Sequence, residues 1–355
     1  MFEELLRRWD GEHAVVRHDA ESGAWILVCI HSTRLGPAMG GTRLKAYDTP
    51  DDALDDALRL SAGMTRKLAV LGLPCGGGKA VLAVPTIPAG EERRSLLERY
   101  GDLIESLGGS YVTGPDVNTG EADMNVIGER TRHVFCRSVA EGGSGDPSIH
   151  TALGVYHGIR ASLAHVDGTD DLAGRTVLVQ GTGSVGAKLA RLLLDAGAVV
   201  LVSDVDEERA RTTGGMPVPA DVALELECDV YAPCALGATL TAASIPTLRC
   251  RVVAGAANNQ LAEPEDAERL RAAGILYAPD YVINGGGALH GIGLEQLGWD
   301  ADRLEREVAG IADTLTGIYR QAEAEQITTN EAAERLAAER LGSPDPNLGV
   351  SAPER

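Results

Sequence analysis

Two lysines in a glycine-rich stretch are the side chains best suited to chemistry in this sequence. Lys67 and Lys79 lie 12 residues apart in GMTRKLAVLGLPCGGGKAVLAV, and Lys79 follows three consecutive glycines. The apolar run Ala80–Val84 predicts a buried strand, so we expect Lys79 where this strand meets a cleft. Burial and a second nearby cation both lower the pKa of a lysine, because they disfavour its charged form. Such a lysine can act as a general base near neutral pH.

The glycine run before Lys79 has two other interpretations. The stretch alone also fits a loop lysine beside a flexible glycine turn, and this alternative stays open at this point. A phosphate-binding loop fits less well, because Leu73 stands where that motif has its first glycine. Ala80 also replaces the Ser or Thr that would hold magnesium.

Acid and amide side chains follow several predicted strands. Asp116 comes shortly after the predicted strand Ser110–Thr113, where an acid can face a cleft, although Asp is also common in turns after proline. The amides lie at the edge of an α/β sheet where ligands bind, and each of them alone is also a common turn residue. They are Asn258, Asn259 and Asn284, after the predicted strands Arg251–Ala254 and Tyr281–Ile283.

A glycine fingerprint for dinucleotide binding starts at Gly181. The letters GTGSVG follow the apolar strand Thr176–Gln180 and open a predicted helix, and Asp204 ends the next strand 23 residues later. The glycines allow a tight turn and bring a pyrophosphate to the helix N-terminus, while the acid bonds the ribose hydroxyls and repels a 2′-phosphate. This predicts NAD rather than NADP, with a plain glycine turn as the alternative. The predicted contacts are Gly181, Gly183, Ser184, Val185, Gly186 and Asp204.

The remaining pattern predicts an α/β chain whose strands and helices carry these residues. Thr49 as N-cap and Pro50 as first residue begin a predicted helix that delivers the chain to Lys67. Alternating strands and helices after Arg175 predict a doubly wound parallel sheet. Other predicted elements are a hairpin of His13–His18 and Ala24–His31, a strand at Asp229–Ala232, helices at Ser95–Leu107, Thr151–Leu163, Ala187–Ala196 and Leu304–Ala324, and a capping box at Thr328–Glu331.

The glycine-rich joint Gly142–Pro147 is the clearest break in the chain and predicts a domain boundary. Residues 1–146 are then the substrate-binding and catalytic domain, and residues 147–325 are the Rossmann NAD-binding domain. Residues 326–355 form a C-terminal helix and a tail, Ser343–Arg355, whose polar, proline-containing composition predicts disorder.

Charge and cysteine content restrict the partners and the compartment. A net charge of −20 argues against nucleic acid and against anionic membrane surfaces as partners. The six cysteines form no C-x-x-C pair and do not cluster with the eight histidines, so neither a disulfide framework nor a metal site is expected. No apolar segment approaches membrane-spanning length, and we expect a cytoplasmic protein.

Together these motifs resemble those of the NAD-dependent leucine, valine and phenylalanine dehydrogenases of the glutamate dehydrogenase superfamily. The likeness covers nearly the whole chain and includes GPAMGGTRLKAYDTPDDALDDALRLSAGMTRK, GLPCGGGKAVL, YVTGPDVNTGEADM, CDVYAPCALG, GAANNQLAEP and YAPDYVINGGG. The resemblance implies an N-terminal α/β catalytic domain, a Rossmann domain, and C-terminal helices that return to the first domain. It also implies a homo-oligomer, either a dimer or an octamer.

The resemblance implies a role for each matching residue. Lys67 becomes the anchor of the substrate carboxylate, Lys79 the catalytic lysine and Asp116 its acidic partner. The backbone at Gly40 and Gly41 helps to bind the carboxylate. The other expected substrate contacts are Met39, Gly114, Asn284, Ala288 and Gly291, and the other expected cofactor contacts are Thr151, Ala257 and Asn258.

The implied reaction is the reversible oxidative deamination of an L-amino acid to a 2-oxo acid and ammonia, without a metal. Lys79 activates the attacking water, and Asp116 shuttles protons as the carbinolamine collapses. Two alternatives stay open: a family member recruited to a biosynthetic pathway, and a catalytically decayed NAD-binding protein. The two lysines, Asp116 and the glycine fingerprint together argue against decay, because the fold alone does not require two lysines facing one cleft.

Three small residues predict the size of the substrate. As the resemblance implies, branched-chain enzymes usually carry alanine at the position that matches Gly114, and valine at the positions that match Ala288 and Gly291. The phenylalanine enzymes resemble this chain in having glycine at the position of Gly114. Each missing methyl group leaves space that a substrate can fill. A bulky, aromatic amino acid such as phenylalanine is therefore predicted, with Met39 lining the pocket and a branched-chain substrate as the alternative.

Two departures from the family pattern bear on this pocket. Leu68 stands where relatives usually have Asn after the first lysine, which changes the hydrogen bonding expected near Lys67. The segment GGGALHGIGLEQLG after Asn284 is one residue longer than the usual continuation. An insertion near Gly293 could push Leu289 or Ile292 inward and restore a small pocket.

Overall fold

The computed structural model describes residues 2–235 and 237–342, which fall into two compact units. The first unit runs through Asp146 and also contains Gly291–Trp299 and residues 337–342; the second consists of Pro147–His290 and Asp300–Leu336. The break after Asp146 lies in the glycine-rich joint. The later boundaries differ from the predicted segments 147–325 and 326–355, because Gly291–Trp299 returns to the first unit for only nine residues. A prediction that divides the chain into consecutive segments cannot show such a short return. The predicted disordered tail, Ser343–Arg355, lies outside the described residues.

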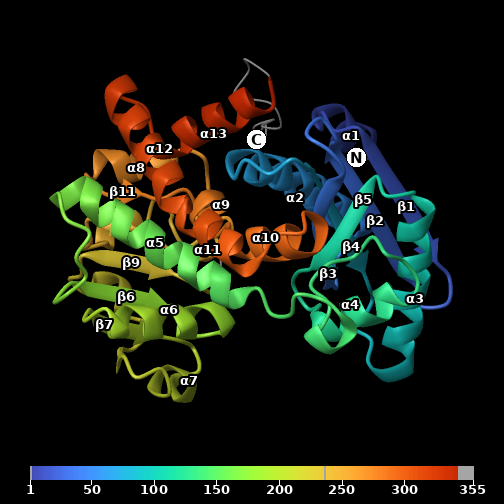
Figure 1. Ribbon diagram of the computed structural model, residues 1–355, viewed down its shortest axis with the longest axis horizontal. Coiled ribbons are helices and arrows are strands. Elements are labelled where there is room, and N and C mark those ends of the chain that lie inside the picture. The colour runs from blue at the N-terminus through green and yellow to red at the C-terminus, as the bar shows by residue number, and fades with distance from the viewer. Residues whose placement is uncertain (1, 236, 343–355) are drawn as a thin grey trace. The chain divides into compact units, whose positions relative to one another are not determined.

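The first unit is built on a five-stranded mixed sheet in the order β1-β2-β4-β3-β5 (Figure 1). β1 and β2 form the predicted antiparallel hairpin, β4 runs antiparallel to β2, and β3 lies parallel to both β4 and β5. The strands are β1 His13–Asp19, β2 Ala24–Ser32, β3 Ala38–Lys45, β4 Gly76–Ala83 and β5 Tyr111–Pro115. The helices are α1 Phe2–Arg8, α2 Pro50–Val70, α3 Gly90–Ser106 and α4 Glu121–Gly128, with a 3-10 turn η1 at Val139–Glu141.

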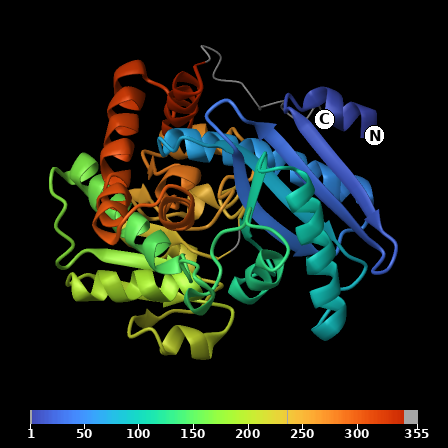
Figure 2. The same cartoon turned by 45° about the vertical axis from the view of Figure 1, so that its right-hand side comes forward.

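Helices cover both faces of this sheet, so alternate residues of each strand enter different cores. On one face, α3 packs Leu96 and Tyr100 with Leu82 of β4. On the other face, α2 packs Ala57 with Val81 of β4. Figure 2 shows the long β1–β2 hairpin in blue with the teal helix α3 running along the sheet. A side chain two residues from Val81 therefore points toward α2.

Helix α2 begins where the sequence predicts. Thr49 Oγ1 accepts a hydrogen bond from the Asp52 backbone N at 3.2 Å, and the Asp52 carboxylate accepts one from the Thr49 backbone N at 3.0 Å. With Pro50 as its first residue, the helix has a complete capping box, and an N-cap of this kind stabilises a helix by about 1 kcal/mol. The helix continues to Val70, which places Lys67 in its last turn.

The end of the chain returns to the first unit, as the resemblance implies. Arg340, in the last turn of α13 (Thr329–Arg340), donates hydrogen bonds to the backbone oxygens of Ala69 and Val70 at the end of α2. A cation at this place also interacts favourably with the negative end of the helix dipole. At the N-terminus of α13, Thr328 Oγ1 accepts from the Glu331 backbone N at 3.1 Å, which is one of the two bonds of the predicted capping box.

The second unit contains a six-stranded parallel sheet in the order β11-β10-β9-β6-β7-β8. The chain runs outward from β6 in one direction through β7 and β8, and in the other through β9 to β11. Open α/β sheets bind ligands where the strand order reverses, here between β6 and β9. The strands are β6 Thr176–Gln180, β7 Val199–Ser203, β8 Met216–Pro217, β9 Val230–Pro233, β10 Val252–Val253 and β11 Leu276–Tyr277.

Two predicted elements of this region are wrong in type or extent. Tyr281–Ile283 belongs to the short helix α9 (Asp280–Ile283) rather than to a strand, because a short apolar run fits a buried helix equally well. The predicted helix Leu304–Ala324 is two helices that meet at Gly310. The remaining elements are α5 Ser148–Asp167, α6 Ser184–Asp195, α7 Glu207–Arg211, η2 Ala223–Glu225, η3 Ile245–Thr247, α8 Asp266–Ala272, α10 Gly286–Gly291, the π-helical turn η4 Ile292–Gln296, α11 Ala301–Ala309 and α12 Ile311–Glu325.

All six cysteines are free thiols. Within the described ranges, no helix combines the length and the apolar character needed to cross a membrane.

The close approach of α2 and β4 can be tested at Gly77. A Cβ atom on Gly77 would lie 2.0 Å from the backbone N of Thr65 and 2.4 Å from its Cα, so the backbone must shift. We expect Gly77→Ala to lower the midpoint of thermal unfolding by several degrees, since overpacking costs about 1–3 kcal/mol.

Gly63→Ala is the matched control in the same region. A Cβ on Gly63 would meet nothing within 4 Å, and alanine favours a helix over glycine by about 0.8–1 kcal/mol. The midpoint should stay the same or rise. A Gly77→Ala protein as stable as the Gly63→Ala protein would contradict the packing described here.

Candidate functional site

Lys79 lies inside strand β4. The strand begins at Gly76, so the glycine run forms part of it, and Lys79 pairs with Cys29 of β2. The side chain shares the face of Val81 beneath α2 and is only 5% exposed. Burial therefore agrees with the expectation from sequence, whereas the expected position at the start of a strand is wrong.

Asp116 contacts Lys79 directly. The Lys79 Nζ lies 3.1 Å from the Asp116 Oδ2, and Asp116 comes immediately after β5. Lys67 is partly buried in the last turn of α2. Thr65, two residues before Lys67, packs on Gly77, two residues before Lys79. The structure thus brings the two predicted lysine segments together on one face of the sheet.

Arg43 is a charged member of this cluster that sequence reasoning missed. Its Nε lies 2.8 Å from Asp116 Oδ2, and its Nη1 lies 2.8 Å from Asp56 Oδ2, which also accepts from the Tyr47 hydroxyl at 2.7 Å. The available signal is the spacing in GGTR: Arg43 stands two residues after Gly41, so on one strand both share a face. The second cation near Lys79 is therefore an arginine of β3.

Burial and charge move the pKa values of this cluster apart. Burial lowers the pKa of Lys79, and Arg43 lowers it further, while Asp116 acts in the opposite direction. Burial by itself raises the pKa of Asp116, but Lys79 and Arg43 lower it to about 2. The cluster pairs a lysine that loses its proton readily with a carboxylate that stays ionised, which suits a general base.

The predicted glycines Gly41 and Gly114 lie beside Lys79 on the same face of the sheet and leave it without side chains; we call these two residues the glycine floor. Gly41 pairs with Gly114 of β5, and the next residue of β3 pairs with Ala80 of β4, so Lys79, Gly41 and Gly114 stand in one row across three parallel strands. Gly40 cannot carry a side chain, because a Cβ would lie 1.9 Å from the Gly78 oxygen. Met39, two residues before Gly41, is buried in the same strand.

The space expected beside Gly114 and Gly291 is occupied by Phe135. A Cβ on Gly114 would lie 2.4 Å from both Cε2 and Cζ of the Phe135 ring. A Cβ on Gly291 would lie 2.7 Å from Cδ2 of the same ring and 2.6 Å from Cys136 Sγ. The expectation that these two missing side chains leave open space is therefore wrong, because a residue from another segment fills it.

The structure shows how the chain accommodates the two departures from the family pattern, Leu68 and the segment after Asn284. The segment expected to be one residue longer contains the π-helical turn η4, and a π turn accommodates one extra residue within a helix. Leu289 and Ile292 are both buried. Leu68 is fully buried as well, so an apolar contact stands where a polar side chain was expected.

The predicted substrate residues Asn284 and Ala288 lie in the second unit, together with three of the predicted cofactor contacts. Asn284 donates from Nδ2 to Asn258 Oδ1 at 2.7 Å and to the Ala256 oxygen at 3.1 Å, so the structure brings these two predicted asparagines together. Asn284 follows the helix α9 and is 4% exposed, whereas Asn258 is exposed. Ala257 is buried beside them, Ala288 is partly exposed in α10, and Thr151 lies in the first turns of α5.

The glycine loop after β6 has the form that a pyrophosphate needs. Gly181 has φ +94°, and a Cβ there would lie 2.5 Å from the Ala235 Cβ, while a Cβ on Gly186 would lie 1.9 Å from the Gly181 oxygen. A Cβ on Gly183 would meet nothing within 4 Å. The first and third glycines therefore allow the turn and the packing, and the second leaves an open approach to the α6 N-terminus, where Ser184 and Val185 present backbone N–H groups.

Asp204 holds this loop and borders a cavity. Its Oδ2 accepts from the Thr182 backbone N at 2.7 Å and from Thr182 Oγ1 at 2.9 Å, and its Oδ1 accepts from the Asp206 backbone N at 2.9 Å. Burial raises the pKa of Asp204, but these hydrogen bonds outweigh it, so the net pKa is lowered. The cavity has about 420 Å³ and largely apolar walls that include Val205 and Pro217. Its volume is within the range of cavities that bind small molecules, about 300–1,000 Å³.

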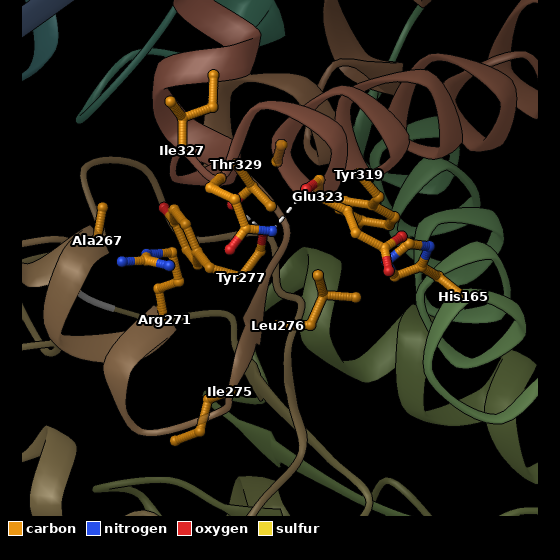
Figure 3. A pocket seen from close by; sticks show the side chains of 12 residues that line it. His165, Ala267, Arg271, Ile275, Leu276, Tyr277, Tyr319, Glu323, Ile327 and Thr329 are labelled. Atoms are coloured by element: carbon orange, nitrogen blue, oxygen red, sulfur yellow. Dashed lines mark hydrogen bonds between the residues drawn. The ribbon is translucent and has the colours of Figure 1, made fainter.

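A separate cavity of about 190 Å³ also lies in the second unit (Figure 3). His165, Tyr277 and Tyr319 line it, together with residues of α8 and the end of α12. Its lining residues include none of those expected to bind substrate or cofactor.

The sheet with its switch point, the glycine loop and the acid after β7 are the features of a dinucleotide-binding α/β fold. The Glu/Leu/Phe/Val dehydrogenase dimerisation domain matches residues 17–133, and the Glutamate/Leucine/Phenylalanine/Valine dehydrogenase domain matches residues 142–214 and 207–344.

Relatives and solved structures agree with this match. The leucine dehydrogenase of Thermoactinomyces intermedius is 41% identical over 95% of this chain and 93% of its own. The valine dehydrogenase of Streptomyces virginiae is 44% identical over 93% of each. The crystal structure of L-tryptophan dehydrogenase from Nostoc punctiforme is 38% identical with a TM-score of 0.81, over 96% of this chain and 98% of that one. The chain belongs to the Glu/Leu/Phe/Val dehydrogenase family and is an amino acid dehydrogenase.

The electrostatic role of Arg43 can be tested through the pH profile of the enzyme. Arg43→Gln removes a cation that lowers the Lys79 pKa, so that pKa should rise toward its ordinary value. If neutral Lys79 is the base, the activity in the deamination direction should then rise at higher pH than in the unmodified protein. The measurement is kcat/KM against pH.

Arg59→Gln is the control, because Arg59 also pairs with Asp56, at 2.7 Å, but its side chain is 52% exposed. The control should leave the profile in place. An Arg43→Gln profile that overlays that of the control would contradict the coupling between Arg43 and Lys79.

Proposed function

We propose that this amino acid dehydrogenase uses NAD to deaminate an apolar L-amino acid reversibly to the 2-oxo acid and ammonia. The observation that carries the proposal is the buried contact of 3.1 Å between Lys79 and Asp116, beside a floor of glycines. One amino acid, one oxidised cofactor and one water give one oxo acid, one ammonium ion, one reduced cofactor and one proton.

Each residue of the first unit has a distinct task in this proposal. Lys67 and the Gly40–Gly41 backbone bind the substrate carboxylate. Neutral Lys79 takes a proton from water, which adds to the imine carbon. Asp116 moves protons as the carbinolamine releases ammonia. Burial supports the base, because it lowers the pKa of Lys79.

In the second unit, the glycine loop and Asp204 are the proposed binding groups for the cofactor. When bound, NAD accepts the hydride from the substrate Cα. The carboxylate of Asp204 borders the cavity of about 420 Å³ and would repel a 2′-phosphate, which favours NAD over NADP. Thr151, Ala257, Asn258 and Asn284 are further proposed contacts, Asn284 toward the substrate.

Two observations support different substrate sizes. The Phe135 ring fills the room beside Gly114 and Gly291, which favours an aliphatic side chain of leucine or valine size. The relatives named leucine and valine dehydrogenases are in line with this choice. A bulky aromatic substrate, as predicted from the sequence, is the second candidate and is supported by the likeness to L-tryptophan dehydrogenase. Met39 and Ala288 are proposed to line the pocket in either case.

We also propose that the protein works as a homo-oligomer. The matched N-terminal domain is described as a dimerisation domain, and a related solved structure, 26% identical with a TM-score of 0.76, is a hetero-hexameric glutamate dehydrogenase from Thermus thermophilus. A dimer or an octamer is expected from the resemblance of the sequence.

Replacing the proposed base tests the chemistry. Lys79→Ala should lower kcat by about 100-fold or more, because the general base contributes on this scale, and should leave NAD affinity nearly unchanged. Lys67→Ala should chiefly raise KM. Steady-state kinetics and NAD titration measure both effects. The exposed Lys45→Ala is the control and should keep normal turnover. Normal turnover by Lys79→Ala would remove the proposed base.

Replacing Asp204 tests the choice of cofactor. Asp204→Ala should weaken NAD binding by about tenfold or more relative to NADP, because a hydrogen bond to a charged group contributes about 1.5–3 kcal/mol. Thr182→Val is the control, since it removes the hydroxyl bond to Asp204 and keeps the carboxylate. The comparison is the ratio of kcat/KM for the two cofactors. An unchanged ratio in Asp204→Ala would mean that another residue recognises the ribose.

A further inference from the structure

The Phe135 ring stands at the end of the glycine floor that starts at Lys79. Val134 pairs with Thr113 in a parallel bridge, so Phe135 extends the row of Lys79, Gly41 and Gly114 by one position. Neighbouring strands lie about 4.8 Å apart, which separates the backbones of Lys79 and Gly114 by about 10 Å. Between Lys79 and Phe135 this row contains two residues, Gly41 and Gly114, neither of which has a side chain.

The ring leans over this floor instead of pointing away from it. Its Cε2–Cζ edge lies 2.4 Å from the place of a Gly114 Cβ, and Gly291 approaches the ring as well, with Cδ2 2.7 Å from the place of its own Cβ. Any side chain at either glycine would collide with the ring. The side chain of Phe135 is 7% exposed, so it is packed in place.

The backbone around Phe135 is held on both sides. Its own N–H donates to the Thr113 oxygen at 2.9 Å. The next residue, Cys136, has φ +58°, which is a strained conformation for a residue other than glycine. The carboxylate of Glu295, from the π-helical turn η4, accepts from the Cys136 backbone N at 2.6 Å and from the Ser144 backbone N at 2.9 Å. These bonds fix the direction in which the ring projects.

We propose that Phe135 is a specificity-determining residue that closes the substrate side-chain pocket at the end opposite Lys79. The inference rests on the proposed function, in which the substrate is bound over the Gly41–Gly114 floor. The ring occupies volume that an aromatic substrate needs, so the unmodified enzyme selects aliphatic side chains. The two glycines accommodate this internal ring rather than a larger substrate.

Truncation of the ring tests the inference. Phe135→Ala should raise the ratio of kcat/KM for phenylalanine over leucine by about tenfold or more, the range over which pocket size discriminates between substrates. Phe135→Leu should change the ratio in the same direction by less, and it keeps most of the packing if the alanine variant fails to fold. Leucine, valine, phenylalanine and tryptophan are each assayed with NAD, and thermal unfolding is followed in parallel.

Val134→Ala is the matched control. Val134 is the adjacent residue, is 3% exposed and packs in the opposite core of the first unit, so its truncation should lower stability without changing the ratio. An unmodified enzyme that prefers phenylalanine to leucine would overturn the inference, as would equal ratios in the Phe135 and Val134 variants. If the unmodified enzyme deaminates none of the four amino acids, it is the proposed function that fails.

Discussion

The burial of the Lys79 amine is the constraint on which the first unit depends. A charged ammonium under a helix loses its hydration, and the loss is tolerated because Asp116 lies 3.1 Å away and Arg43 holds that carboxylate in place. The same burial shifts the lysine toward its neutral form. The interaction therefore requires three parallel strands in one register and a helix that covers them, since Lys79 lies in β4, Arg43 lies in β3 and Asp116 directly follows β5.

The glycines of β4 allow helix α2 to pack closely over the strand, as the approach of Thr65 to Gly77 shows. The same glycines weaken the sheet. Residues 76–78 put three glycines into β4, and glycine in a strand lacks both packing surface and conformational preference. The alternate face of the same strand compensates, because Ala80 and Leu82 are fully buried in the core under α3. The capping box at Thr49 and the contact of Arg340 with the end of α2 secure the helix at both ends. Stability is thus supplied around the site rather than within it.

The sequence was informative wherever local chemistry decides the structure. The capping box of α2, the glycine loop after β6 and the β1–β2 hairpin each follow from a few adjacent residues, and the structure has them. Arg43 and Phe135 were missed because their partners are distant in the chain: Arg43 meets Asp116 only when β3 lies beside β5, and Phe135 meets Gly291 only after the chain has passed through the second unit. The prediction of a strand at Tyr281–Ile283 was wrong for another reason. A short run of apolar residues has no periodicity that distinguishes a buried helix from a buried strand.

Contacts between distant segments also explain why likeness to relatives defines the reaction more firmly than the substrate. The charged cluster depends on several strands at once, and the loss of Asp116 would take away the carboxylate that both Lys79 and Arg43 contact, which costs several kcal/mol. The pocket depends on apolar contacts worth about 0.8 kcal/mol per methylene, and these can be exchanged between segments. Here, the space beside two glycines is filled by the ring of Phe135, and the segment after Asn284 that is expected to be one residue longer contains a π turn that supplies Glu295. Substrate size therefore follows from the sum of these side chains, and no single position in the sequence defines it.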